Sequence, residues 1–153
     1  MLVIWILLLI VIFVIGFVIG EFMAYTWHRF VSHSNIPAIS TSHKTHHNAS
    51  FDDTATEDFV HVAIILVVAV AIFILAYTIL NVRCDWLVVP LVLASVSVFV
   101  VNWWVHACIH DTRYTGSYIS DLRIIHKVHH ANPRANYSVL HLMDEVMCTA
   151  SST

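Results

Sequence analysis

Three long apolar runs constrain the fold of this chain more than any other feature. Residues 2–20 form an unbroken apolar run, and residues 22–24 extend it beyond Glu21 to the ~20 residues that a helix needs to cross a bilayer core. Residues 59–80 and 86–105 form two more runs. A cleaved signal peptide is the alternative for the first run, but no Lys or Arg precedes it and it is long for such a segment. The sequence therefore predicts about three membrane-spanning helices.

Composition agrees with a membrane protein and excludes several other classes. The chain is 59% hydrophobic and 11% charged, whereas soluble domains are roughly 25% charged. A formal charge of -3 provides no global basic field for nucleic acid. The three cysteines include no C-x-x-C pair, which argues against a disulfide framework and a zinc ribbon.

The order of the apolar runs predicts which segments share a side of the membrane. Residues 81–85 are a short connector, so the second and third spans form an antiparallel hairpin, and segments 25–58 and 106–153 lie on one side. These segments carry six of the seven Lys and Arg residues, which indicates the cytoplasmic side. We expect an all-α integral-membrane protein with a cytoplasmic histidine-rich cap, forming a single domain over residues 1–153.

Histidine is the outstanding excess, with twelve in the chain. Ten of them fall into four boxes with the spacings H-x4-H, H-x2-HH, H-x3-H and H-x2-HH, namely His28, His33, His43, His46, His47, His106, His110, His126, His129 and His130. Residues three or four apart share a helix face, so each of the last three boxes projects its imidazoles together. His28 and His33 lie roughly 140° apart on a regular helix, and only a helix end or a distorted turn brings them to one metal.

The chemistry of imidazole predicts a metal centre at these boxes. Ionisable groups next to membrane spans normally mark a functional site. Neutral imidazole suits Fe, Zn, Cu or Ni, and ten imidazoles are too many for one tetrahedral zinc ion. The number of histidines therefore favours two metal ions.

The order of the four boxes resembles the fatty acid hydroxylase/sterol desaturase superfamily of integral-membrane diiron oxygenases, and the related beta-carotene hydroxylases share much of it. The third box, with three intervening residues, is closer to the fatty acid hydroxylases than to the carotenoid enzymes, which usually have four. Asn136-Tyr137, followed by Asp144 and Thr149, resembles the superfamily's closing N-Y-G…W-D-x-x-F-G-T, although Ser138 replaces its first glycine.

The resemblance implies that the ten box histidines hold two iron ions. Zinc binds imidazole more tightly than Fe(II), so zinc in purified protein is compatible with this reading. Further candidates for the metal environment, as ligands or as partners that orient them, are His61, His141, Asp111, Asp121, Asn136 and Asp144.

The same resemblance implies an O2-dependent hydroxylase, or a desaturase, acting on a membrane lipid such as a fatty acyl chain or a sterol. A carotenoid β-ring hydroxylase is the alternative. The chain has no flavin or nicotinamide fingerprint such as G-x-G-x-x-G, so we expect an external electron donor such as cytochrome b5 or ferredoxin. The enzyme would reside in the endoplasmic reticulum of a eukaryote or the inner membrane of a bacterium.

Two readings from other classes stay open at this point. One is a histidine-rich, metal-binding membrane protein without catalysis; a purely structural membrane protein with incidental histidines would retain no stoichiometric metal after purification. A metal transporter would need ligands within its spans, and the three apolar runs are nearly free of them.

Overall fold

The computed structural model describes residues 1–51 and 85–151, together with isolated positions between 63 and 78. The predicted second span at residues 59–80 and its connector therefore lie largely outside the described residues, as does His61. Every element of the described part is helical.

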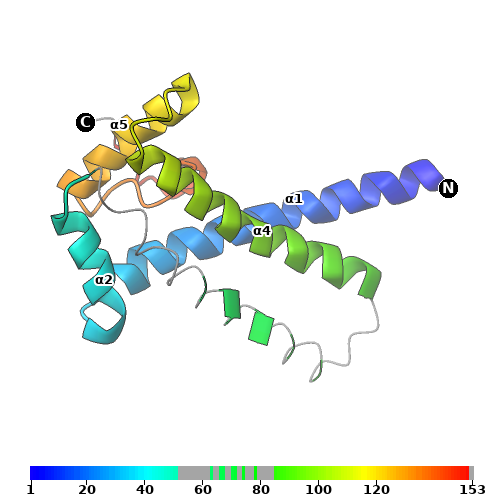
Figure 1. Cartoon of the computed structure of the whole chain (residues 1–153). Coiled ribbons are helices and arrows are strands. Elements are labelled where there is room, and N and C mark those ends of the chain that lie inside the picture. The colour runs from blue at the N-terminus through cyan, green and yellow to red at the C-terminus, as the bar shows by residue number, and fades with distance from the viewer. Residues whose placement is uncertain are drawn as a thin grey trace.

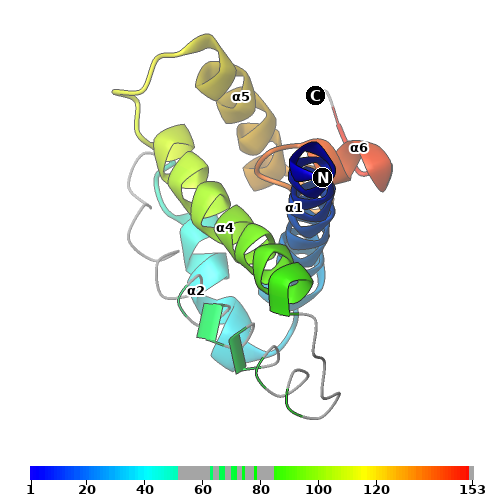
Figure 2. The same ribbon diagram turned by 90° about the vertical axis from the view of Figure 1, so that its right-hand side faces the viewer.

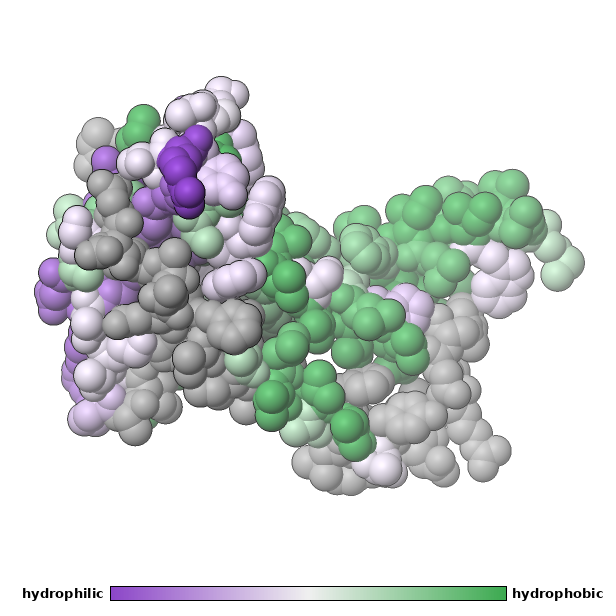
Figure 3. Space-filling model, in the orientation of Figure 1, coloured by the Kyte–Doolittle hydropathy of each residue, from purple (hydrophilic) through white to green (hydrophobic). Residues whose placement is uncertain are grey.

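The helices follow the predicted pattern of long apolar spans and a polar cap (Figure 1). In chain order they are α1 (Leu2–Thr26), the π-helix η1 (Trp27–Ser32), α2 (Pro37–Asn48), α4 (Asp85–His110), α5 (Ser117–Ala131) and α6 (Leu142–Val146). Leu2–Ser32 and Leu87–His110 are long and apolar enough to cross a membrane. Hydrophobic residues cover these two helices away from the cap, and hydrophilic residues gather on the cap (Figure 3).

Helices α1 and α4 pack closely because two glycines of α1 face α4. A Cβ atom at Gly16 would lie 2.5 Å from the carbonyl oxygen of Leu91, and one at Gly20 would lie 2.5 Å from the carbonyl oxygen of Ser95. The Ser95 hydroxyl also donates a 2.9 Å hydrogen bond to the Gly16 carbonyl oxygen. Gly16 and Gly20 thus form the small-xxx-small pattern by which membrane helices approach one another.

Alanine at Gly20 is expected to lower the free energy of unfolding by about 1–3 kcal/mol, because the added methyl group overpacks the α1–α4 contact. Alanine at Gly116 is the matched control, since a Cβ atom there has no neighbour within 4 Å. Denaturant unfolding of both variants in detergent checks the prediction. Equal stability of the two variants would show that the close approach at Gly20 contributes little.

The cap is assembled on the ends of α1 and α4 that carry the histidines. Arg123 of α5 closes the corner after α4, because its guanidinium donates hydrogen bonds to the carbonyl oxygens of Cys108, Ile109, Asp111 and Tyr114. One apolar cluster contains Val105, Ile109 and Leu122, and a second contains Tyr25, Tyr137 and Met143. These contacts fix α5 and the C-terminal segment over the ends of the two long helices.

Candidate metal centre

All ten box histidines converge into two groups of five. Site A is defined as His28, His33, His43, His47 and His129, and site B as His46, His106, His110, His126 and His130. Within each group one nitrogen from every ring lies within 4.8 Å of the corresponding nitrogens of the other four. The described part of the chain therefore offers two separate five-imidazole sites.

The π-helix η1 explains how the first box reaches one site. The His33 backbone N–H bonds to the His28 carbonyl oxygen at 3.3 Å, a link across five residues. The wider turn stacks the two rings with centroids 5.1 Å apart and 22° between their planes. The spacing predicted a helix end or a distorted turn, and the π-helix provides the distorted turn.

Two cap helices contribute to both sites, which the spacing alone does not reveal. On α2, His43 and His47 belong to site A, whereas His46 belongs to site B. On α5 the division is reversed, because His129 alone joins site A. The His47 and His130 rings stack across the boundary with centroids 4.4 Å apart. The two sites are therefore adjacent and are built on the same pair of helices.

Backbone carbonyl groups orient three of the rings. His28 Nδ1 bonds to the carbonyl oxygen of Tyr137 at 2.5 Å, and His129 Nδ1 bonds to that of Ala135 at 2.6 Å. In site B, His110 Nδ1 bonds to the carbonyl oxygen of Phe51. A carbonyl oxygen only accepts, so the ring proton is on Nδ1 and the Nε2 lone pair points into the site.

The spacing of the Nε2 atoms fits a metal ion. In site A the Nε2 atom of His43 lies 3.0 Å from that of His28 and 3.1 Å from that of His33. In site B the Nε2 atom of His106 lies 3.1 Å from the Nε2 atom of His110. Two imidazoles bound at right angles, with metal–nitrogen bonds of about 2.1 Å, would place their nitrogens about 3.0 Å apart. Converging lone pairs repel one another unless a cation lies between them.

The environment keeps these imidazoles neutral, the state in which they bind metal. Burial is the main cause that lowers the pKa of His33 to about 4 and the pKa of His129 to about 3. Burial also lowers the pKa of His43 well below its ordinary value, with further lowering from neighbouring histidines. At neutral pH these rings are therefore available as ligands.

A buried carboxylate holds the loop that orients His28. Asp144 is fully buried and accepts hydrogen bonds from the backbone N–H groups of Tyr137 at 2.8 Å and Ser138 at 2.6 Å. The Thr149 hydroxyl donates a third bond to it at 2.7 Å. Asp144 thereby fixes the Tyr137 carbonyl group opposite His28 from outside the metal site.

The other candidate residues lie outside the two sites. His141 belongs to neither group, and its Nε2 atom lies 3.2 Å from a Glu145 carboxylate oxygen. Asp111 is paired with Arg113, whose hydrogen bonds lower the pKa of this carboxyl group to about 2. The Asn136 amide bonds to the backbone of Ile125 and Ser151. Asp121 is an exposed residue of α5.

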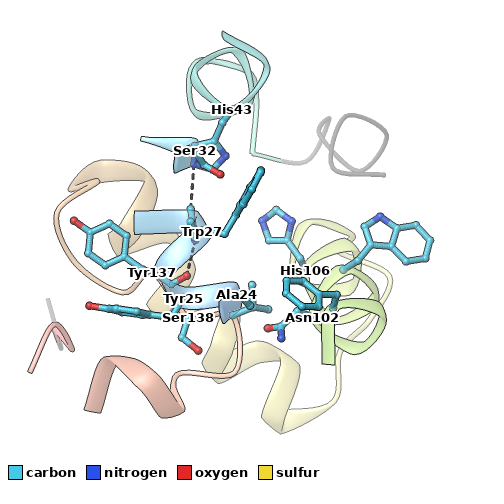
Figure 4. A pocket seen from close by; sticks show the side chains of 13 residues that line it. Ala24, Tyr25, Trp27, Ser32, His43, Asn102, His106, Tyr137 and Ser138 are labelled. Carbon is cyan, nitrogen blue, oxygen red and sulfur yellow. Dashed lines mark hydrogen bonds between the residues drawn. The ribbon is translucent and has the colours of Figure 1, made fainter. Parts of the chain in front are cut away.

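A cavity of about 110 Å³ lies between α1, α4 and the loop after Asn136, next to both sites. Its lining includes His28 and His43 of site A and His106 of site B. Figure 4 shows the Trp27 ring between His43 and His106. The buried Trp27 Nε1–H group has no hydrogen-bond partner among the described residues. Trp27 lines the cavity with its ring, and its Nε1–H group is buried away from the accessible space.

A polar network that the sequence analysis did not identify adjoins this cavity. Glu21 is 1% exposed, and its carboxyl group accepts hydrogen bonds from Asn102 Nδ2 at 2.7 Å and from the Ser138 hydroxyl at 3.1 Å. Both donors line the cavity. The signal in the sequence was a single carboxyl group at the end of an apolar run.

Comparison with known proteins places the chain in a family. The sequence profile of the family described as fatty acid hydroxylase matches residues 13–149, which is most of the chain. No curated protein and no solved structure matches it.

Proposed function

We propose that this chain, which belongs to the fatty acid hydroxylase family, is a membrane-bound, O2-dependent diiron oxygenase that hydroxylates, or desaturates, a lipid at an unactivated C–H position. The observation that carries the proposal is the pair of five-histidine sites beside a shared cavity. The family supports a lipid hydroxylase or desaturase, and the two apolar helices support a membrane protein.

The ten histidines of sites A and B would hold two iron ions, which supply the activation of O2 when bound. The chain itself keeps the Nε2 atoms unprotonated, through the carbonyl groups that accept from the Nδ1–H of His28, His110 and His129. It also buries the rings of His110 and His129, and this limits the access of water to the two sites. The protein thus orients and shields the chemistry that the metal ions provide.

Electrons come from a separate protein in this proposal. Hydroxylation inserts one oxygen atom of O2 into the C–H bond and reduces the other to water, which consumes two electrons and two protons. The chain has no G-x-G-x-x-G fingerprint for a flavin or nicotinamide, so a donor such as cytochrome b5 or ferredoxin would supply the electrons. The excess of Lys and Arg on the histidine-bearing segments supports a cytoplasmic site.

The cavity supports a substrate with an alkyl group at the reacting carbon. Phe99 and Ala24 provide apolar lining beside the histidines, as an alkyl group requires. The third histidine box has three intervening residues, as in the fatty acid hydroxylases, whereas carotenoid hydroxylases usually have four. This spacing and the family match favour a fatty acyl or sterol substrate over a carotenoid.

Product analysis tests the proposed function. The chain is expressed with an electron donor in a host that contains fatty acyl, sterol and carotenoid precursors, and lipids are compared by mass spectrometry with those from a His106→Ala variant. We expect a hydroxylated or desaturated acyl or sterol product that the variant lacks. A carotenoid product would establish the alternative. Retained metal without any product would support a metal-binding protein that does not catalyse.

A further inference from the structure

We propose that residues 142–147, which comprise α6 and Met147, insert into the bilayer interface as a lipid-contacting element of the cap. Their outward side chains Leu142, Val146 and Met147 would contact acyl chains of the leaflet in which the histidine-bearing ends of α1 and α4 emerge. This inference concerns an interaction surface, and it stands independently of the reaction that the histidine sites perform.

The position of α6 is fixed by its contacts with α1. In Figure 2, α6 lies beside α1, and contacts between the two helices confirm this. Met143 of α6 packs with Tyr25 in the core cluster that also contains Tyr137. Before and after α6, Ser138 bonds to Glu21 at 3.1 Å and Thr149 bonds to the Tyr25 hydroxyl at 3.2 Å. The element is therefore docked on α1 between Glu21 and Tyr25.

This stretch of α1 lies close to the membrane interface. Tryptophan is enriched where a span leaves the hydrocarbon region, and Trp104 of α4, which is 55% exposed, marks that level. Glu21 bonds to Asn102, which precedes Trp104 by two residues, or about 3 Å along a helix. An element docked beside Glu21 and Tyr25 therefore lies near the boundary between headgroups and acyl chains, where interfacial helices bury their apolar faces.

The side chains of this segment have the distribution of an interfacial element. Met143 is 5% exposed and Asp144 is fully buried against the protein, whereas Leu142 is 43% exposed, Val146 63% and Met147 41%. The last three would expose apolar surface to water if the cap stood clear of the membrane. The Glu145 carboxylate lies 3.2 Å from His141 Nε2, and the Glu145 side chain is 68% exposed.

Lipid is the occupant that the surroundings favour. The neighbouring surface of α1 is itself apolar and exposed, with Phe22 at 48% and Met23 at 40%. Helix α1 is long and apolar enough to span a membrane, so this surface faces acyl chains. Leu142, Val146 and Met147 are likewise apolar and exposed, on a segment that contacts α1. A bilayer would therefore stabilise residues 142–147. Through them it would stabilise the preceding loop with Tyr137, which lines the cavity.

Depth-dependent fluorescence quenching tests the proposal on the full chain. Val146→Cys is labelled with an NBD fluorophore in a Cys84→Ser, Cys148→Ser background and reconstituted into phosphatidylcholine vesicles, with or without bromine atoms on the acyl chains. Thr41→Cys, on the exposed surface of α2, is the matched control. We expect severalfold stronger quenching at position 146 than at position 41.

A second label position keeps the test decisive if Val146→Cys fails to fold. Cys148 is exposed directly after Met147, so it can be labelled in a Cys84→Ser background with residues 142–147 unchanged. Quenching at Cys148 above that at position 41 would support insertion. Quenching at positions 146 and 148 equal to that at position 41 would overturn the proposal. Crosslinking that shows a second copy of the chain covering the labelled positions would overturn it as well.

Discussion

Alanine at His129 is expected to leave one metal ion per chain instead of two, and alanine at His46 is expected to do the same by disabling the other site. His129 belongs to site A and His46 to site B. Each substitution removes one of five imidazoles from one site, and loss of a ligand leaves that coordination shell incomplete. Activity should fall below detection in both variants, because the proposed reaction uses both ions. Metal analysis of iron-reconstituted protein measures the occupancy.

Double substitutions distinguish two independent sites from a single diffuse cluster. His33→Ala with His129→Ala removes two ligands of site A and should still leave one ion, held in site B. His46→Ala with His129→Ala removes one ligand from each site and should leave none. His141→Ala is the control, because His141 lies in neither group, and it should retain two ions. Equal occupancy in the two double variants would contradict the separation into sites A and B.

Alanine at Asp144 is expected to weaken metal binding at site A by about 10–100-fold, although Asp144 contacts no metal ligand. The change leaves the buried N–H groups of Tyr137 and Ser138 without their acceptor, at a cost of about 1–3 kcal/mol each. The Tyr137 carbonyl group can then move away from His28, which loses the bond that orients its ring. Competition with a chelator measures the affinity of each site.

Two controls separate this positioning effect from a general loss of structure. Site B receives no orienting bond from Tyr137, so its affinity should be unchanged in the Asp144→Ala protein. Asp121 is an exposed carboxylate on α5, and Asp121→Ala should leave both sites intact. Equal weakening of sites A and B would indicate that Asp144 stabilises the whole cap instead of orienting His28.

The sequence was sufficient to predict two long apolar helices and the unusual turn at the first histidine box, because both depend on local patterns. An apolar run of about 20 residues predicts a membrane helix regardless of its tertiary contacts. The five-residue spacing of His28 and His33 predicted a helix end or a distorted turn, and η1 provides the distorted turn. The first and third predicted spans correspond to α1 and α4, whereas the second lies largely outside the described residues.

The division of the boxes between two sites could not be predicted from spacing. Residues three and four apart share a helix face, and His43, His46 and His47 were expected to project together. His43 and His47 join site A and His46 joins site B, and this division depends on which histidines of α5 lie opposite each ring. The position of α5 is set by contacts such as those of Arg123, which are distant in sequence from α2.

The carbonyl groups that orient the rings were also beyond sequence reasoning. Every residue has a carbonyl oxygen, so no residue type marks Tyr137, Ala135 or Phe51 as a partner of a histidine. Asp144 could be nominated as a supporting carboxylate, but its action through the loop at Tyr137 required the fold. The pairing of Glu21 with Asn102 joins two helices and likewise depends on their register.

Turnover under isotopically labelled dioxygen is the most direct test of the oxygenase assignment. The iron-loaded chain is incubated in lipid vesicles with an external reductant, a redox partner and the lipid identified by product analysis. For a hydroxylase, we expect one labelled oxygen atom in each product molecule, and no product when dioxygen or the reductant is omitted. For a desaturase, we expect an alkene with no added oxygen and the same two requirements. A hydroxylated product without the label, or turnover without dioxygen, would contradict the proposed O2-dependent chemistry.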